Sequence, residues 1–461
     1  MVGVPGGSKG CLTCRKRRIK CDQTRPLCQR CDKAGYKCQG YERALDVRTH
    51  SFASDGMTVT TQVSKPERLN SGPQAVELTV PPSLSLVAFK DVVEFSFLLD
   101  NFVWRTFTWP WLELCAQGKL GQLPLDACQC LAQNVFGTHH HQQDIQLQGL
   151  VLYGQAVREM TEQLKNPGAD LIVPILLLMM NASNSGDRQA AQFHVGGLFR
   201  VIQACKPASF AKLPLLSAFE SARSTLFTIS LITKQRCFLE ADSWKTEPWR
   251  NLHKSPQNEL VDIMVDIPGI MQGLAEDKDK EVIKLRSNLS ALDRWRMRWE
   301  HVNPAAAWEL APADLPEGKS VGGSRVFSEV LWFQTFTQAT EVILYNSALL
   351  CILGLLAECG LGDELPKAPT ISLLGQETSA REAAQQICRA FEFQLLNVAA
   401  SRDSALFWLL PLGIADKVLE SDGRFRVWIQ SLLDESKKLR RYGTGTSEFA
   451  FGHFDFLSHI I

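Results

Sequence analysis

The sequence lacks the short motifs on which many enzymes depend. Its 461 residues contain no glycine-rich phosphate loop ending in GK[ST], no H-E-x-x-H pair, no G-x-S-x-G element and no dinucleotide-binding fingerprint. An active site assembled from scattered residues leaves no such signature, so the absence argues against an enzyme without excluding every kind. We therefore expect a protein that is not an enzyme.

Long apolar runs are also missing. The two longest strongly apolar stretches, near residues 171–180 and 405–415, are shorter than a bilayer crossing requires, and each contains a proline. The first residues, MVGVPGGSKG, have no apolar core of the kind that a secretory signal needs. We expect a soluble intracellular protein with no membrane partner.

The sequence also has no net charge, because 49 Lys and Arg balance 49 Asp and Glu. The distribution is uneven. Residues 1–50 contain 12 basic and 4 acidic residues, a formal charge of +8, which leaves −8 on the remaining 411 residues. A polyanion attracts a basic segment and repels an acidic one. The sequence therefore predicts that the N-terminal segment contacts a polyanion and that the rest of the chain stays away from it.

Six of the fourteen cysteines form two halves that repeat one spacing at an offset of 17 residues, Cys11-x2-Cys14-x6-Cys21 and Cys28-x2-Cys31-x6-Cys38. A C-x-x-C turn places two thiolates within reach of one metal ion, and thiolates in tetrahedral geometry suit zinc. The segment contains no histidine, so two of the six thiolates must bridge to complete the eight coordination positions of two zinc ions. Symmetry favours Cys11 and Cys28. We expect a closed structural site without a position for a catalytic water.

The two halves differ in charge. Between the second and third cysteines, the first half has five cations in six positions, Arg15-Lys16-Arg17-Arg18-Ile19-Lys20. The corresponding stretch of the second half, residues 32–37, has Lys33 and Lys37. Each stretch is long enough for about one helical turn after the metal-binding turn. Only the first half has the dense positive charge that binding to a polyanion requires.

Residues 10–41 resemble the binuclear zinc-cluster domain of fungal six-cysteine transcription factors. The resemblance covers every cysteine, the basic run, the Lys20-Cys21-Asp22 tripeptide and Pro26 in the loop between the halves. It implies a short first helix that enters the DNA major groove and reads a CGG triplet through Arg17 and Arg18. It also places Arg15, Lys16 and Lys20 close to phosphates.

Many members of that family have lysine at the positions of Arg17 and Arg18. Arginine can pair bidentately with guanine O6 and N7, so we expect base reading to persist with a different geometry.

The segments beside this module show little periodicity. We expect residues 1–9 to be disordered and residues 42–85, rich in Ser, Thr, Gln, Pro and Gly, to be a flexible linker. The linker contains no a/d heptads, so the zinc module with its linker is expected to be monomeric. Any homodimer must then form through the remaining part of the chain.

From about residue 86 onward, apolar residues recur at helical spacing. We predict an all-α domain over residues 86–442 and an aromatic tail over 443–461. The pattern predicts helices over 145–164, 171–182, 190–204, 215–238, 282–299, 327–356, 378–398, 405–420 and 425–441. Loops are expected near 240–257, 301–324 and 360–376.

This domain resembles the fungal-specific transcription factor domain over about residues 86–440. Tyr153-x3-Val157, the apolar helix Ile175–Met180 and His194-x-x-Gly197 carry the resemblance, and residues 405–415 are similar to the apolar helix near that domain's end. The resemblance implies a regulatory role.

Several other features have a structural interpretation that we favour over a functional one. We expect His139, His140 and His141 to form a polar loop or helix end rather than a metal site, and His194 to be a helix-packing residue. The eight cysteines outside the array are expected to be buried free thiols. The tail, with Phe449, Phe451, Phe454 and Phe456, has the composition of an acidic activation segment, and docking onto the helical domain is at least equally compatible with it.

These features together predict a nuclear, sequence-specific DNA-binding regulator of RNA polymerase II transcription, an activator in preference to a repressor. It would bind two zinc ions, double-stranded DNA and co-regulator proteins, and act in a secondary-metabolite or nutrient pathway. The alternative is a helical ligand-binding or scaffold protein whose zinc module binds a protein partner. Binding to DNA through several cations must weaken steeply with salt, which separates the two hypotheses.

Overall fold

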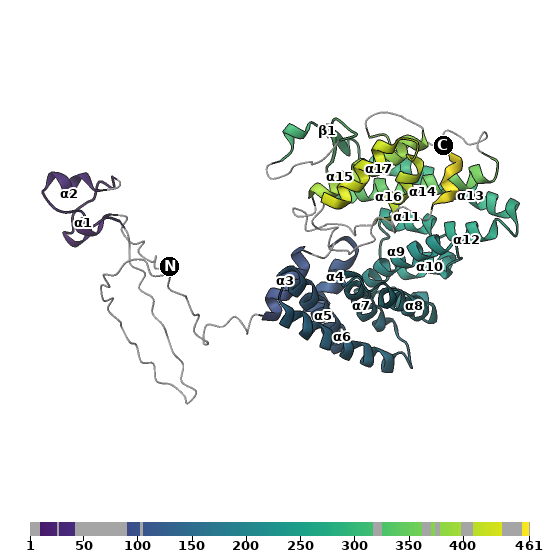
Figure 1. Cartoon of the computed structure of the whole chain (residues 1–461), viewed down its shortest axis with the longest axis horizontal. Helices are drawn as coiled ribbons and strands as arrows, with labels where there is room; N and C mark the ends of the chain where they lie inside the picture. The colour runs from purple at the N-terminus through teal and green to yellow at the C-terminus, as the bar shows by residue number, and fades with distance from the viewer. Residues whose placement is uncertain are drawn as a thin grey trace. The chain divides into compact units, whose positions relative to one another are not determined.

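The computed structural model describes residues 10–24, 27–41, 90–101, 105–316, 325–361, 370–373, 379–397, 409–435 and 454–460. The chain divides into two units, Met1–Pro81 and Pro82–Ile461 (Figure 1). The predicted N-terminal disordered segment, the predicted linker and the first part of the aromatic tail, including Phe449 and Phe451, lie outside the described residues.

Two short helices of the small unit each begin within a C-x-x-C turn. Helix α1 (Leu12–Lys16) begins after Cys11, and helix α2 (Gln29–Lys33) begins after Cys28. The first cysteine of each turn is thus the N-cap of its helix, and the second cysteine is buried within the helix. This arrangement confirms the two short helices that the repeated spacing predicts.

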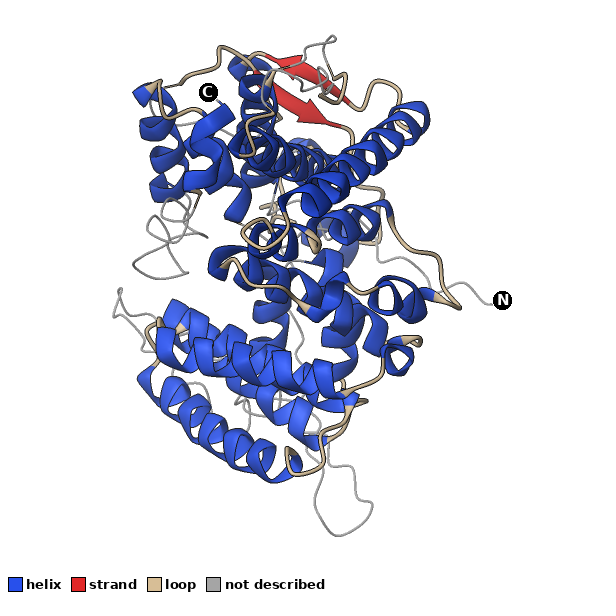
Figure 2. Ribbon diagram, turned by 90° about the vertical axis from the view of Figure 1, so that its right-hand side faces the viewer, coloured by secondary structure: helices blue, strands red, loops and turns tan. Residues whose placement is uncertain are grey.

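The large unit is mostly helical, with one pair of short strands in its described part (Figure 2). The α-helices of its first half are α3 (Lys90–Asn101), α4 (Arg105–Ala116), α5 (Gln122–His139), α6 (Gln143–Gln163), α7 (Ile172–Asn184), α8 (Arg188–Ala204) and α9 (Leu215–Thr233). Those of the second half are α10 (Asp242–Thr246), α11 (Pro256–Met264), α12 (Ile267–Gly273), α13 (Lys278–Val302), α14 (Phe336–Glu358), α15 (Ala380–Asn397), α16 (Leu410–Val418) and α17 (Gly423–Glu435).

The first half of the large unit is organised around the α5–α6 pair and helix α7. Helices α5 and α6 pack along each other, and α7 contacts both α5 and α8. The apolar run of α7 is buried from Ile172 to Leu178, which explains why its sequence is apolar on all sides. Asp187 caps helix α8 by accepting a hydrogen bond from the Ala190 N–H (2.9 Å).

Helix α14 forms the core of the second half. It begins at a capping box made by Thr335 and Gln338 and packs against α11, α13, α15 and α16. Within this helix, the Asn346 amide nitrogen donates to Gln386 Oε1 (3.0 Å). Of the helices described, α14 is long and apolar enough to cross a membrane, and its apolar window is 100% buried, as in the core helix of a folded domain.

Most predicted helices agree with the structure to within a few residues. The helix predicted over 215–238 ends at Thr233, because Lys234 adopts a left-handed backbone (φ 53°). The expected loop at 240–257 contains the short helix α10. The last two predicted helices, 405–420 and 425–441, are described only in part, as α16 and α17. Residues 401–408 and 436–453 lie outside the described residues.

The main difference from the sequence prediction is a two-stranded antiparallel sheet. Strand β1 (Ala307–Leu310) lies in the expected loop, and strand β2 (Val330–Phe333) occupies the start of the expected helix 327–356. The register pairs Ala307 with Phe333 and Leu310 with Val330. Because the capping box fixes the start of α14 at Phe336, the apolar residues before it are free to pair as a strand.

The described part of the aromatic tail docks onto the large unit. A short 3-10 helix, η10 (Asp455–Ile460), contacts α14 and α16. Phe454, Phe456 and Leu457 are buried in the main core. Docking is therefore the correct interpretation for this part of the tail.

Candidate zinc and nucleic-acid site

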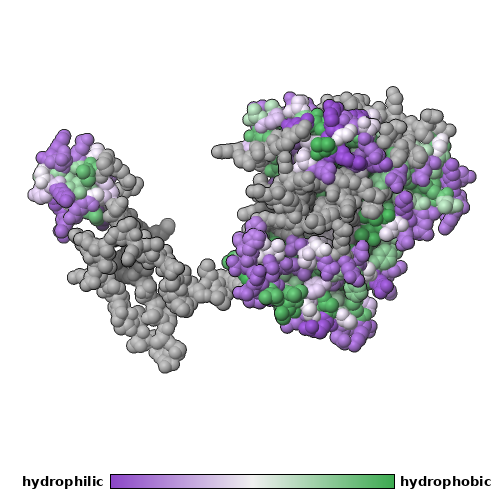
Figure 3. All heavy atoms as spheres, in the orientation of Figure 1, coloured by the Kyte–Doolittle hydropathy of each residue, from purple (hydrophilic) through white to green (hydrophobic). Residues whose placement is uncertain are grey.

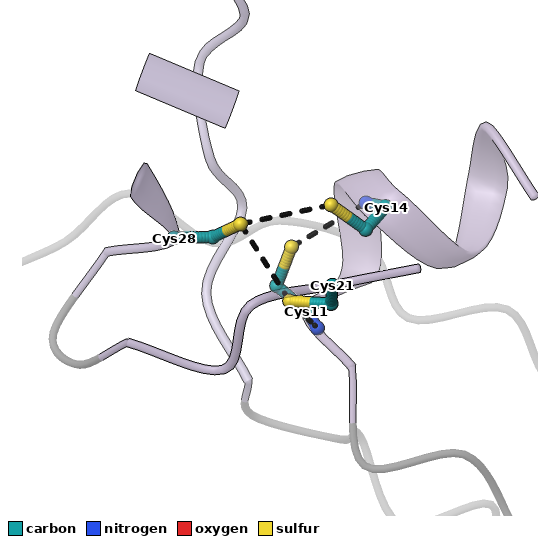
Figure 4. Close-up of side chains that lie close together, drawn as sticks. All are labelled: Cys11, Cys14, Cys21 and Cys28. Carbon is teal, nitrogen blue, oxygen red and sulfur yellow. Dashed lines mark hydrogen bonds between the residues drawn. The ribbon is translucent and has the colours of Figure 1, made fainter. Parts of the chain in front are cut away.

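The cysteine sulfurs of the small unit converge in two groups. The first contains Cys11, Cys14, Cys21 and Cys28, whose sulfurs all lie within 4.8 Å of one another and point toward a common centre (Figure 4). The second group, with the same spread, contains Cys11, Cys31 and Cys38. Cys11 is common to both groups, as a bridging thiolate must be.

The spacing of the sulfurs fits tetrahedral zinc. A Zn–S bond of about 2.3 Å gives an S···S edge of about 3.8 Å in a regular tetrahedron. The structure has Cys14 Sγ 3.6 Å from Cys28 Sγ, Cys21 Sγ 3.6 Å from Cys28 Sγ, and Cys11 Sγ 3.7 Å from Cys31 Sγ. These distances are far longer than a disulfide bond, and all six thiols are free. The first group thus offers four sulfurs to one zinc ion, and the second group offers three to another.

Hydrogen bonds to the sulfurs repeat at the 17-residue offset. The N–H of Cys11 donates to Cys21 Sγ and the N–H of Cys28 donates to Cys38 Sγ, both at 3.4 Å. Burial raises the pKa of the Cys11 thiol to about 12. A thiolate at this position thus needs a neighbouring cation, which a zinc ion supplies.

Asp22 and Tyr41 connect the two halves. The Asp22 carboxylate accepts from the Arg30 N–H in α2 (2.6 Å) and from the Thr24 hydroxyl (2.7 Å). The Tyr41 hydroxyl donates to the Thr24 carbonyl (2.8 Å) and lies 3.6 Å from Cys21 Sγ. A segment of this size has almost no apolar core, so these bonds and the metal ligands hold it together. Sequence reasoning assigned no role to either residue.

The basic residues of the first half lie mostly in solvent. Arg15, Lys16, Arg18 and Lys20 are exposed, and Arg17 is half-buried. At the 17-residue offset, the lysines at 16 and 20 correspond to lysines in the second half. The arginines at 15, 17 and 18 correspond to Asp, Ala and Gly. The charge difference between the halves therefore arises from three arginines on or directly after α1, together with Asp32 in the second half.

Arg18 has an unusual backbone conformation. It lies in the left-handed region (φ 56°), and Gly35, its counterpart in the second half, has φ 66°. Matching hydrogen bonds close both turns, from the Arg18 N–H to Arg15 O (3.1 Å) and from the Gly35 N–H to Asp32 O (3.0 Å). Glycine adopts this conformation without strain, whereas a residue with a Cβ pays about 1 kcal/mol or more. The first half thus keeps an arginine where the fold prefers glycine.

Arg17 packs against the second half through a cation–π contact. Its guanidinium carbon lies 3.7 Å from the centroid of the Tyr36 ring. Arg17 Nη1 is buried and has no hydrogen-bond partner among the residues that the structure describes, as expected of a guanidinium nitrogen over a ring face. Tyr36 is a functional candidate that sequence reasoning missed, because the contact joins residues on opposite halves.

The remaining candidates have the structural roles that the sequence predicts. Helix α5 ends at His139 and is capped by His140, whose ring lies 4.3 Å from that of Phe136. His194 is buried, and its Nε2 lies 2.8 Å from the Tyr153 hydroxyl. The eight cysteines outside the array are free thiols; seven are buried and Cys205 is half-buried. None of these residues belongs to a described group with metal-ligand geometry.

Comparison with known proteins identifies the N-terminal segment. Residues 9–48 match the fungal Zn(2)-Cys(6) binuclear cluster domain. The chain is 62% identical over 32 residues to the transcriptional regulatory protein moc3 of Schizosaccharomyces pombe, a segment that is 7% of this chain and 6% of that protein. It is 59% identical over 39 residues to the aspercryptin biosynthesis cluster-specific transcription regulator atnN of Emericella nidulans (8% and 6%), and 55% identical over 29 residues to the transcription activator AMTR1 of Alternaria alternata (6% and 4%).

These similarities concern a small part of each protein, since the aligned segments span at most 6% of these three relatives. No solved structure matches the chain. The zinc-cluster resemblance predicted for residues 10–41 is confirmed by the match, and the printed names of the relatives describe regulators of transcription. The resemblance of residues 86–440 to a fungal transcription factor domain stays a prediction.

Proposed function

We propose that the protein is a nuclear, sequence-specific DNA-binding regulator of transcription. The zinc-cluster domain would bind two zinc ions through Cys11, Cys14, Cys21, Cys28, Cys31 and Cys38, with Cys11 and Cys28 as the bridges. The two sulfur groups, which share Cys11, and the matching family support the ligand set. Cys28 belongs to the first group only, so its assignment as the second bridge rests on the symmetry of the two halves. The large helical unit then carries regulation and contacts to co-regulators.

The observation that carries the proposal is the left-handed backbone of Arg18. A left-handed residue can simply end a helix, as Lys234 does, but Arg18 also has an exposed side chain where the second half has glycine, which points to a role outside the fold. We assign base reading of a CGG-type triplet to Arg18 and Arg17, since a guanidinium can pair bidentately with guanine. Arg15, Lys16 and Lys20 are exposed on the same short segment and are assigned to phosphate contacts.

The finer assignments follow the relatives. The names of atnN and AMTR1 describe a biosynthesis cluster-specific regulator and an activator. We therefore assign this protein to activation of a biosynthetic or nutrient pathway. A homodimer through the helical unit belongs to the same proposal, because it would bring two zinc modules to one DNA site.

A binding titration of the full-length protein tests the proposal. Affinity for a CGG-containing duplex is expected to exceed affinity for a scrambled duplex and to fall with salt, with a log-log slope of about −0.9 per phosphate neutralised. Equal affinity for both duplexes with a shallow slope would contradict DNA recognition and favour a protein partner for the zinc module. A reporter gene with the selected site distinguishes activation from repression.

A further inference from the structure

Helix α6 exposes an apolar face. Leu147, Leu150 and Val151 are 60%, 64% and 60% exposed, although a surface helix normally turns such residues toward the core. At about 100° per residue, they lie opposite the buried residues Ala156 and Met160, which face the rest of the unit. Figure 3 shows green, hydrophobic surface on the lower part of the large unit, where Figure 1 places α6. A cluster of exposed apolar side chains on one helix face marks an interaction surface.

Gly154 lies on the same face, one helical turn after Val151. A Cβ built at this position meets Arg158 Nη1 at 3.7 Å, an ordinary contact, so the packing of the chain itself does not require glycine. Glycine in a helix interior weakens the helix relative to alanine. A missing side chain on an exposed apolar face instead lets the side chain of another helix approach the backbone closely.

Two charged residues border this face on opposite sides of its centre. Asp144 lies in the first turn of α6, and Arg158 lies one turn beyond Gly154. Both side chains are exposed, and both fall within the same arc of the helix as Leu147 and Val151. The face thus has an acid and a large residue toward one end, and a base and a small residue toward the other.

This order of residues makes the face of one α6 complementary to the same face of a second α6 that runs in the opposite direction. If a second copy of α6 runs antiparallel with a two-fold axis between Leu150 and Val151, Leu147 lies opposite Gly154 of the second copy. Asp144 then lies within one residue's rise, about 1.5 Å, of the level of Arg158 of the second copy. The two-fold axis repeats each of these two contacts, so that each occurs twice in the dimer, as an isologous interface requires.

We propose that the α6 face, defined as Asp144, Leu147, Leu150, Val151, Gly154 and Arg158, is a homodimer interface that binds α6 of a second copy in antiparallel orientation. The inference specifies the surface for the dimer suggested under Proposed function, and it does not require DNA recognition. A contact of one helix pair is at the small end of specific interfaces, so we expect a dimer that dissociates in the micromolar range.

Sedimentation of the full-length protein without DNA tests the proposal. The expected result is a monomer–dimer equilibrium over loading concentrations of roughly 1 to 100 μM. Gly154→Leu fills the hollow and should weaken dimerisation by about tenfold or more, while its better helix propensity leaves the fold intact. Ile283→Glu alters an exposed apolar residue of α13 (68% exposed) and should leave dimerisation unchanged. A protein that stays monomeric throughout, or a dimer indifferent to Gly154→Leu, overturns the inference.

A charge exchange tests the antiparallel orientation. Asp144→Arg or Arg158→Asp alone places like charges together twice and should weaken the dimer several-fold, whereas the double variant restores the pairs and should recover much of the lost affinity. Circular dichroism of each variant controls for helix stability. Single variants that weaken the dimer without recovery in the double variant would overturn the antiparallel pairing. Because no DNA is present, failure here is distinct from failure of DNA recognition.

Discussion

The Arg17 guanidinium and the Tyr36 ring are stacked across the two halves of the small unit, with 3.7 Å between the guanidinium carbon and the ring centroid. Stacking restricts the guanidinium to one plane. Because Arg17 follows α1 and Tyr36 follows α2, the second half orients a residue of the first. The less basic half thus contributes to the proposed DNA recognition by orienting Arg17.

Replacing Tyr36 should weaken recognition through Arg17. Tyr36→Ala removes the ring and lets the guanidinium move, and a cation–π contact at a partly exposed site is worth about 0.5–1 kcal/mol. We expect affinity for the CGG duplex to fall by roughly two- to fivefold and Tyr36→Phe to retain wild-type affinity. Binding titrations with both variants check this. Tighter binding by Tyr36→Ala would show instead that the ring withholds Arg17 from DNA.

The Arg18→Gly variant should keep the fold of the zinc module and lose part of its proposed DNA recognition. Glycine relieves the left-handed backbone, so zinc content and folding should be retained or improved. The loss of a base-reading arginine should cost about 1–3 kcal/mol of affinity for the CGG duplex and reduce the preference over a scrambled duplex.

Gly35→Ala is the matched control, since it places a Cβ at the equivalent position in the second half, where no atom lies within 4 Å. It should destabilise the module by about 1 kcal/mol through backbone strain and leave the triplet preference unchanged. If Arg18→Gly lowers affinity equally for both duplexes, Arg18 contacts phosphate rather than a base.

The sequence predicted those features that depend on local spacing. The cysteine array and the helix at 143–163 were predictable because sulfur spacing and three-to-four-residue periodicity are properties of neighbouring residues. Strand β2 was not, because a short apolar run before a helix has no periodicity of its own and its partner β1 lies about 20 residues away in an expected loop.

Two features of the candidate site differ in how visible they are in the sequence. The contact between Arg17 and Tyr36 depends on how the two halves fold together, and no spacing rule indicates it. The positive φ of Arg18 did leave a signal. Aligning the halves at the 17-residue offset places Arg18 over Gly35, and a glycine that closes a helix indicates a left-handed backbone.

Zinc should be essential to the small unit. Elemental analysis of the purified full-length protein is expected to give two zinc ions per chain, and Cys21→Ala should lower this number and abolish binding to the CGG duplex, because metal binding supplies the folding free energy. Cys205→Ala, which removes a half-buried thiol outside both sulfur groups, should retain both ions. One zinc per wild-type chain, or an iron–sulfur absorption band, would refute the bridged cluster.

The stability of the large unit should depend on pH through Glu341. Burial raises the pKa of Glu341 to about 7, although its carboxylate accepts a hydrogen bond from Trp299 Nε1 (2.7 Å). In the unfolded chain the pKa is about 4.3. The folded state therefore binds the proton more tightly, and the free energy of unfolding should fall as pH rises from about 4.3 to about 7, by up to about 4 kcal/mol.

Glu341→Gln should remove this contribution, because the glutamine oxygen can accept from the same indole N–H and the side chain has no charge to bury. We expect the variant to be more stable than the wild type at pH 8 and to show a smaller difference between pH 5.5 and pH 8, measured as urea unfolding midpoints. Half-buried Glu220 and Asp266 and buried Glu392 also have raised pKa values, so part of the pH dependence should remain. Glu358→Gln, at the exposed end of the same helix, should leave the pH dependence unchanged. An unaltered pH dependence in Glu341→Gln would show that Glu341 is ionised in the folded protein at neutral pH.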